Sequence, residues 1–253
     1  MAGLEFNESH GVHADCAYQA RTPWLWWQAL GFTALTLAIA MLVAQFASQG
    51  LVNGGFRQAN WNFLLAMAAS QLTAICLTWL AGGRFGGRRW NLLALGSPVQ
   101  GKRVYLASFL AMVTVSGLFS ALAWWVWPQQ VLADLAFFEE FIRSDAWWLA
   151  VLVIGLGAPV MEELLFRGFL FPALAQTRIG LIGAAVSTSA GWAALHAGYS
   201  SLGLIEVFAV GLYFSWLLVR TGSLRVPMFC HAAYNLAVVA LLTVVDISAV
   251  AAA

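Results

Sequence analysis

The sequence predicts an all-α protein that crosses a membrane several times, a polytopic transmembrane helical bundle of about seven to eight helices, some of them short or broken. Hydrophobic residues make up 62% of the 253-residue chain and charged residues only 9%, whereas soluble domains carry roughly 25% charged residues. The chain also contains 13 Trp, many of them at the ends of apolar runs. Indole rings favour this position because it corresponds to the membrane–water interface.

A helix needs about 20 apolar residues to cross the hydrocarbon core of a membrane. Seven segments approach this length: 24–47, 60–81, 104–127, 147–171, 181–197, 203–219 and 227–245. The fifth and sixth are short, so one of them is expected to be tilted, broken or only partly spanning. Residues 131–143 mix charged with apolar side chains, which favours a short amphipathic helix at the interface or an extension of a neighbouring span.

We expect one membrane domain without internal repeats. Residues 1–23 form a polar N-terminal tail, 24–146 the N-terminal transmembrane helices and 147–246 a C-terminal transmembrane core. The tail lacks the basic region and short apolar segment of a cleaved signal peptide, so the first helix is expected to remain as an anchor. Three cysteines without metal-ligand spacing predict neither a disulfide framework nor a metal site.

Basic residues predict the orientation, because short loops rich in Lys and Arg stay in the cytoplasm. The most basic loop lies between the second and third spans and contains Arg84, Arg88, Arg89, Lys102 and Arg103. Alternation then places the N-terminus inside and the C-terminus outside. The compact size and the lack of an organelle-targeting segment favour a bacterial inner membrane.

The fourth span contains three ionisable residues within six positions, Glu162, Glu163 and Arg167. A charge at the centre of a bilayer costs at least about 2.5–3.5 kcal/mol, so these residues require partners or water. Glu163 and Arg167 are i and i+4 and can form an ion pair. Glu162 points about 100° away around the helix. We therefore interpret Glu163–Arg167 as a supporting pair and Glu162 as the carboxylate available for chemistry, although helix packing alone could also account for all three.

Two later segments carry further polar groups. Trp192 and His196 share one helix face near the end of the fifth span, and His231 and Asn235 share one face of the seventh. Each pair alone could be a packing contact between helices. Together with Glu162, they form a plausible hydrolytic site on three separate helices.

These residue types suit acyl-transfer hydrolysis by water without a covalent intermediate. Glu162, shielded from bulk water, could act as a general base, with His196 helping to hold the water. His231 and Asn235 could donate hydrogen bonds to the oxygen that becomes negative in the tetrahedral intermediate. No cofactor is needed for this chemistry.

The order of these motifs resembles the CAAX-protease and bacteriocin-processing family, also called CPBP or Abi, which includes the Ras-converting CAAX endopeptidase. The resemblance covers residues 147–240 and rests on Glu162-Glu163-x-x-x-Arg167, His196 and His231-x-x-x-Asn235. It implies a metal-independent glutamic endopeptidase with Glu162, His196, His231 and Asn235 as catalytic residues. The family usually has Phe four residues before the first histidine; here that residue is Trp192.

The resemblance implies a membrane-associated protein or peptide as substrate, cleaved near its C-terminus or its membrane-proximal part. Only the lipid bilayer is expected as a further partner; nothing suggests nucleic acid, and the oligomeric state is not indicated. A zinc-dependent membrane protease remains an alternative, since two histidines and a glutamate can bind zinc. So does a non-catalytic immunity or scaffold protein. A transporter or a serine or aspartyl protease is less favoured, because no matching polar pathway or motif is found.

One conflict arises within this interpretation. If every span is a full perpendicular helix, His196 lies near the outer end of the fifth and His231 near the inner end of the seventh. At about 1.5 Å per residue, the two imidazoles would be far apart in depth. The site therefore requires a short or broken helix among the late spans.

Overall fold

The computed structural model describes residues 18–84 and 88–251. The predicted N-terminal tail falls mostly outside these residues. Within them all regular secondary structure is helical and no strand occurs, which confirms the all-α class. The helices are α1 (Trp26–Asn53), α2 (Ala59–Arg84), α3 (Arg89–Leu92), α4 (Arg103–Val126), α5 (Pro128–Ile142), α6 (Trp147–Ala150), η1 (Val151–Gly157), α7 (Ala158–Glu162), η2 (Glu163–Leu170), α8 (Phe171–Ala175), α9 (Gly180–Ala194), α10 (Ser201–Thr221), α11 (Arg225–Val244) and α12 (Ile247–Ala251).

Six of the described helices are long and apolar enough to cross a membrane, and the protein is an integral membrane protein. They are α1, α2, α4, the continuous run from α6 to α8, α10 and α11. The expectation that the fifth or the sixth of the seven segments would not span the membrane fully is confirmed for the fifth, which forms α9. α9 has 15 residues, or about 22 Å of helix, and is too short for a core about 30 Å thick.

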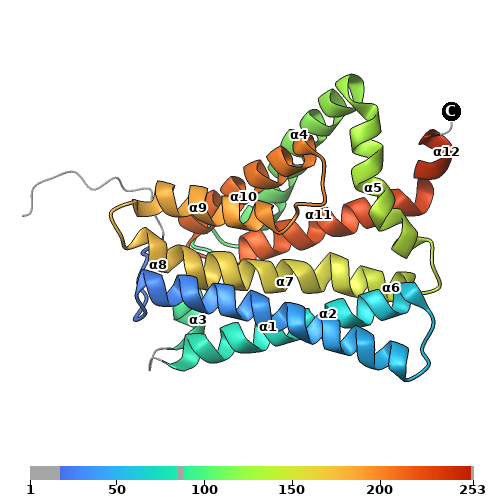
Figure 1. Cartoon of the computed structure of the whole chain (residues 1–253). Helices are drawn as coiled ribbons and strands as arrows, with labels where there is room; N and C mark the ends of the chain where they lie inside the picture. The colour runs from blue at the N-terminus through green and yellow to red at the C-terminus, as the bar shows by residue number, and fades with distance from the viewer. Residues whose placement is uncertain (1–17, 85–87, 252–253) are drawn as a thin grey trace, which may run out of the picture.

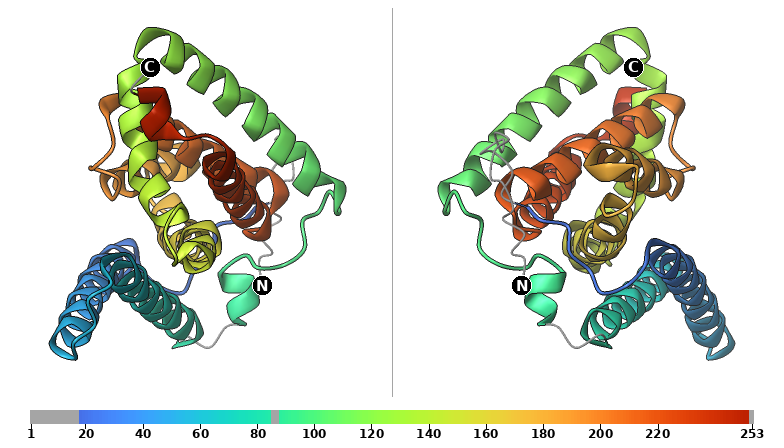
Figure 2. Two further views of the ribbon diagram at one scale, coloured as in Figure 1. Left: turned by 90° about the vertical axis from the view of Figure 1, so that its right-hand side faces the viewer. Right: turned by 90° about the vertical axis from the view of Figure 1, so that its left-hand side faces the viewer.

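The run from α6 to α8, Trp147–Ala175, lies at the centre of the bundle. In its most apolar window 67% of the residues are buried, against 22–33% in the other five spans. Figure 2 shows α1 and α2 as a pair on one side of this central helix, with α4 and α5 on the opposite side. α9, α10 and α11 lie alongside it (Figure 1). Side chains of the central helix therefore face protein rather than lipid.

The central helix contains two π-helical segments, η1 and η2, each followed closely by a proline, Pro159 and Pro172. A proline has no N–H to donate to the carbonyl four residues earlier. Wider turns accommodate such a mismatch, and π-bulges are frequent at functional sites. The prolines thus account for the irregular winding on both sides of Glu162.

Two side-chain amides hold η1 in place from neighbouring helices. Gln71 on α2 donates from Nε2 to the carbonyl of Val153 at 3.1 Å, and Asn235 on α11 donates from Nδ2 to the carbonyl of Ile154 at 2.9 Å. Backbone carbonyls that leave a regular helix ladder inside a membrane need such partners. The N-terminal helices therefore contribute directly to the conformation of the central one.

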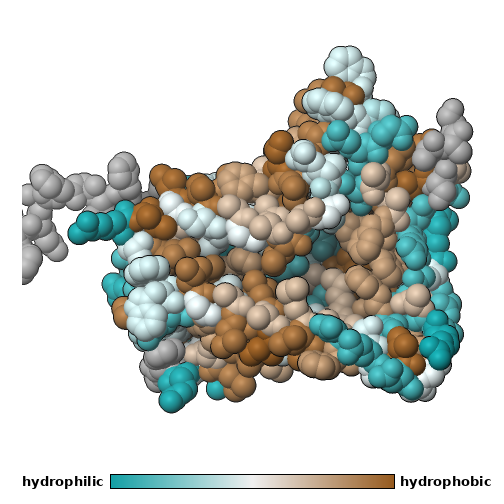
Figure 3. Space-filling view, viewed as in Figure 1, coloured by the Kyte–Doolittle hydropathy of each residue, from teal (hydrophilic) through white to brown (hydrophobic). Residues whose placement is uncertain are grey.

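Acidic and basic side chains lie mostly at opposite ends of the bundle. Among residues 18–84 and 88–251, the acidic residues outside the six spans lie on α5 or at positions 145 and 246, at the end of Figure 1 that carries α5, α6 and α12. Apart from Arg57, Arg143 and the buried Arg167, the Lys and Arg residues belong to segments at the other end, around α3 and the starts of α9 and α11. Figure 3 shows a predominantly hydrophobic surface between these ends.

The amphipathic segment predicted at 131–143 forms α5, Pro128–Ile142. Its Asp134 accepts hydrogen bonds from both the backbone N–H and the hydroxyl of Ser200, at 2.7 and 2.6 Å. Ser200 in turn caps α10 by accepting from the backbone N–H of Gly203. α5 therefore anchors the turn that joins α9 to α10.

The contact between α9 and α10 depends on a glycine. A Cβ atom at Gly211 would lie 2.9 Å from Cβ and Oγ of Ser189 on α9, and 2.9 Å from Nη2 of Arg167 on the central helix. Small residues allow such close backbone approach between helices in a membrane.

We predict that Gly211→Ala lowers the free energy of unfolding by about 1–3 kcal/mol relative to Gly117→Ala, because the added methyl overpacks the α9–α10 contact. Gly117 on α4 has open space around its Cα, so this control receives the same gain in helix propensity without a clash. Thermal unfolding of both variants in detergent measures the difference. Equal midpoints would show that the contact is loosely packed.

Candidate functional site

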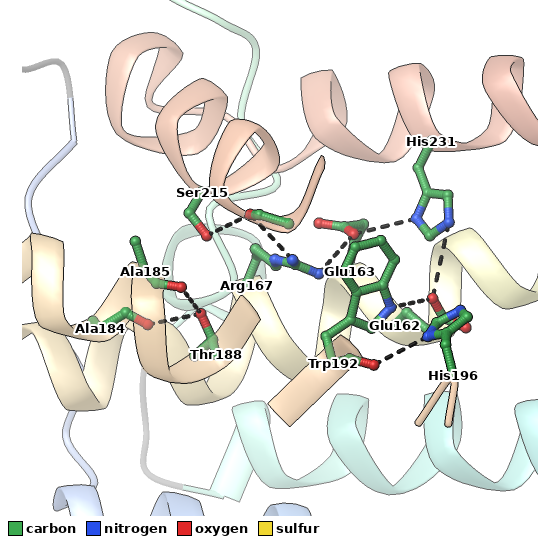
Figure 4. Close-up of polar contacts among 11 residues, drawn as sticks. Glu162, Glu163, Arg167, Ala184, Ala185, Thr188, Trp192, His196, Ser215 and His231 are labelled. Atoms are coloured by element: carbon green, nitrogen blue, oxygen red, sulfur yellow. Dashed lines mark hydrogen bonds and ion pairs between the residues drawn. The ribbon is translucent and has the colours of Figure 1, made fainter. Parts of the chain in front are cut away.

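The three segments singled out in the sequence meet halfway along the central helix. Figure 4 shows the rings of Trp192, His196 and His231 around the carboxylate of Glu162, with Glu163 and Arg167 beside them. Glu162 ends α7 and Glu163 begins η2, so the two adjacent carboxylates leave the helix in different directions. The site is therefore built on the most deeply buried element of the fold.

Glu163 and Arg167 form an ion pair that is fully buried. The Nη1 atom of Arg167 donates to Oε1 of Glu163 at 3.1 Å, and neither side chain has any solvent-accessible surface. The predicted i, i+4 contact is thereby confirmed. The Nη2 atom of Arg167 also donates to the carbonyl of Gly211 on α10 at 3.2 Å.

Aromatic rings cover the guanidinium of Arg167. Its Cζ atom lies 4.6 Å from the ring centroid of Trp192 and 5.7 Å from that of Phe214. A desolvated cation over an aromatic face gains about 2 kcal/mol or more. These rings replace part of the hydration that the charge loses inside the bundle.

Glu162 is held on one side of its carboxylate only. Its Oε2 atom accepts a 2.5 Å hydrogen bond from the indole N–H of Trp192 and lies 3.8 Å from Nε2 of His231. Oε1 has no hydrogen-bond partner within residues 18–84 and 88–251. The side chain is 11% exposed, so this second oxygen is the one available to a water molecule.

His231 lies between the two glutamates. Its Nδ1 atom is 3.3 Å from Oε1 of Glu163, and because a carboxylate paired with Arg167 can only accept, Nδ1 carries the hydrogen. Nε2 therefore faces Glu162. The imidazole stacks on Phe214, with centroids 5.1 Å apart and planes at 28°, so both its position and its rotation are restrained.

His196 lies in the turn after α9, at the depth of Glu162. The short helix resolves the conflict in depth, because α9 ends before it reaches the far side of the bundle. Nδ1 of His196 is 3.1 Å from the carbonyl of Trp192. A carbonyl only accepts, so Nδ1 carries the hydrogen and Nε2 keeps its lone pair.

Asn235 stands apart from the other predicted site residues. Its amide nitrogen binds the carbonyl of Ile154, about two turns before Glu162 on the central helix. Within the described chain its side chain forms no hydrogen bond with the side chain of Glu162, His196 or His231. One of its two amide hydrogens is used by this bond, and the other is available.

Several residues at the site carried no signal in the sequence. Phe214 and Gly211 lie in an ordinary apolar run, and Asp134 lies far away along the chain. Tyr199 packs edge-on against His196, with centroids 5.3 Å apart. Burial, together with the nearby charge of Glu162, raises the pKa of the Tyr199 phenol, so it stays protonated near neutral pH. Only the packing of separate helices reveals these neighbours.

The arrangement offers a carboxylate with a free oxygen, two oriented imidazoles and little water. Such a set can take a proton from a water molecule and deliver that water to a carbonyl group. Within the described residues, no group of three or more His, Cys, Asp or Glu side chains is arranged to hold a metal ion.

Comparison with known proteins identifies one related group. Residues 144–237 match a family model described as type II CAAX prenyl endopeptidase Rce1-like. The match begins just before α6 and ends within α11, and so contains each of the helices that meet at the site. No curated protein and no solved structure matches the chain.

We predict that Arg167→Leu destabilises the protein by about 3–5 kcal/mol, because it leaves the carboxylate of Glu163 buried without its cation. Adding Glu163→Gln to Arg167→Leu removes the uncompensated charge and should restore part of the loss. Thermal unfolding of the wild-type, single and double variants in detergent tests this coupling. Additive effects of the two substitutions would contradict it.

Proposed function

We propose that this protein is an intramembrane endopeptidase of the glutamic type, on the basis that residues 144–237 match a family model described as type II CAAX prenyl endopeptidase Rce1-like. It would hydrolyse a peptide bond near the C-terminus, or in the membrane-proximal part, of a membrane-associated protein or peptide. The observation that carries the proposal is the carboxylate of Glu162, which is held through Oε2 by Trp192 and leaves Oε1 free. No metal or cofactor takes part.

In the proposed mechanism, Glu162 is the general base. Its Oε1 takes a proton from a water molecule while the water oxygen bonds to the scissile carbonyl carbon. The protonated carboxyl then gives that proton to the leaving amine as the C–N bond breaks. Positioned acids and bases of this kind contribute about 10²–10⁴-fold to a rate.

We assign His196 to holding the water. Its Nδ1 hydrogen is used on the carbonyl of Trp192, so its Nε2 can only accept. A water that donates one hydrogen to Nε2 and the other to Glu162 presents its oxygen lone pair to the substrate. Asp134 supports this position from α5, because it fixes Ser200 at the end of the same turn.

We assign His231 and Asn235 to the developing oxyanion. With its Nδ1 hydrogen on Glu163, His231 can donate from Nε2 when it is an imidazolium. Asn235 keeps a second amide hydrogen that it can donate while the first stays on the carbonyl of Ile154. The loss of one such donor typically costs about 3–4 kcal/mol of transition-state stabilisation.

The location of the site favours a substrate that is already in the membrane. Figure 3 shows the surface hollowed between the α9–α10 turn and α5, with hydrophilic side chains inside the hollow. A chain anchored in the bilayer could reach this hollow sideways and meet water there. Because the basic side chains gather at the end that includes Arg21, we propose a cytoplasmic N-terminus, in a bacterial inner membrane.

We predict that Glu162→Gln reduces proteolysis by about 10²–10⁴-fold without loss of stability, because the amide keeps the shape of the side chain and cannot take up a proton. A fluorogenic farnesylated peptide ending in a CAAX sequence is the first probe, measured on protein in liposomes. Substrates of other kinds are sought by proteomics of protein termini, which compares membranes of cells that express the wild-type protein with membranes of cells that express Glu162→Gln. Glu206→Gln is the matched control: it removes a carboxylate within α10, bonded by Tyr234, and should retain activity.

Each alternative has its own outcome in this experiment. Inhibition by a chelator, with zinc in the purified protein, would favour the metalloprotease. A phenotype that survives Glu162→Gln, together with unchanged precursors in both membranes, would favour the scaffold or immunity protein and remove the case for an enzyme.

We also predict that Trp192→Phe lowers kcat by about one to two orders of magnitude with little change in KM. The phenyl ring keeps the aromatic contact but removes the N–H that orients Glu162, and hydrogen bonds to charged groups contribute roughly 1.5–3 kcal/mol. Benzothienylalanine at position 192 is a closer control, since sulfur replaces only the N–H. A wild-type rate in that variant would show that the hydrogen bond does not position the base.

A further inference from the structure

An open cavity of about 460 Å³ lies at the basic end of the bundle, between the loop that precedes α4 and the first turns of α4 and α11. Its lining includes Lys102, Tyr105, Arg225 and Phe229. Phe229 is two positions before His231, so it lies about 200° around α11. The cavity therefore lies on the face of α11 opposite the candidate active site and is separate from it.

Two cations from different helices face this cavity and lack a carboxylate partner. Lys102 and Arg225 are exposed, and neither forms an ion pair within the part of the chain that the structure describes. Arg225 lies over the ring of Trp90, 5.5 Å from its centroid, which orients the guanidinium without neutralising it. The described acidic side chains outside the spans lie at the opposite end of the bundle. An anion for this site must therefore come from outside the described chain.

Aromatic rings continue from the cavity along the lipid-facing side of the bundle. Tyr105 meets Phe229 edge-on with centroids 5.4 Å apart, and Phe109, one turn further along α4, meets Phe229 at 6.3 Å. Leu106 and Leu110, next to these rings on α4, are 62% and 54% exposed. An apolar chain attached to the anion would thus find a continuous surface that leads into the membrane.

We propose that this cavity binds the headgroup of an anionic phospholipid. The phosphate lies between Lys102 and Arg225, and an acyl chain follows Tyr105, Phe109 and Phe229. Basic pockets between transmembrane helices on the cytoplasmic side are a recognised type of site for such headgroups. The apolar wall favours a lipid over a free phosphate compound, whose soluble remainder would gain nothing from aromatic contact. The bound lipid bridges α4 and α11.

Native mass spectrometry on the full chain tests the proposal without any assay of proteolysis. Delipidated protein in detergent is titrated with phosphatidylglycerol or with phosphatidylcholine of the same acyl chains. We expect one phosphatidylglycerol to bind with a preference of about 25-fold, since each of the two basic side chains near an anionic group contributes roughly fivefold. Lys102→Gln combined with Arg225→Gln should abolish this preference.

The control variant also removes two positive charges from the basic end of the bundle. Arg84 and Arg178 are exposed and lie outside the cavity, so Arg84→Gln combined with Arg178→Gln should retain the bound lipid. If both double variants lose the preference for phosphatidylglycerol equally, the proposal is overturned, because the overall positive charge of this end would then account for lipid binding without a specific site. Displacement of the lipid by an equal concentration of glycerol 3-phosphate would also overturn it and indicate a site for a soluble phosphate. Matching thermal midpoints show that each variant is folded.

Discussion

The ion pair between Glu163 and Arg167 is the constraint around which the rest of this structure is arranged. Two opposite charges are held without solvent at the centre of a helix inside a membrane. An isolated charge in such a place costs several kcal/mol, so the surrounding protein must compensate for the lost hydration. Trp192 and Phe214 cover the guanidinium with their rings, and the carbonyl of Gly211 accepts one hydrogen bond from it. Nε of Arg167 and Oε2 of Glu163 have no hydrogen-bond partner within the described residues.

This ion pair also gives the two adjacent glutamates different roles. Glu163 is committed to Arg167 and to one side of His231, whereas Glu162 keeps one oxygen free and some access to water. The same indole ring of Trp192 covers the guanidinium with its face and binds Glu162 with its edge. Structural and proposed catalytic carboxylates are therefore coupled through a single aromatic side chain.

Elements outside the matched segment contribute to the site as well. Asp134 on α5 holds the turn that carries His196, and Gln71 on α2 holds a carbonyl of η1. Both contacts support backbone that is not in a regular helix, and irregular backbone inside a membrane is stable only where the protein satisfies it. The N-terminal helices thus serve as a frame for the late ones rather than as simple anchors.

Much of the architecture could be predicted because the amino-acid composition of a segment indicates whether that segment forms a membrane-spanning helix. Apolar runs gave the spans, and the i, i+4 spacing gave the Glu163–Arg167 pair, since both depend on the geometry of one helix. The sequence left open whether the fifth or the sixth segment is the incomplete span, and the length of helix that forms, 15 residues in α9, decides it.

By itself, the sequence determined the all-α membrane class, the buried ion pair and the residue types able to act on a peptide bond. Only the tertiary structure decided that His196 reaches the depth of Glu162, that Trp192 binds that carboxylate, and that Asn235 binds the backbone of η1 instead. The reason is physical: periodicity gives the face of a helix on which a side chain lies, but depth and partner depend on how separate helices pack. That information is spread over residues distant in the chain.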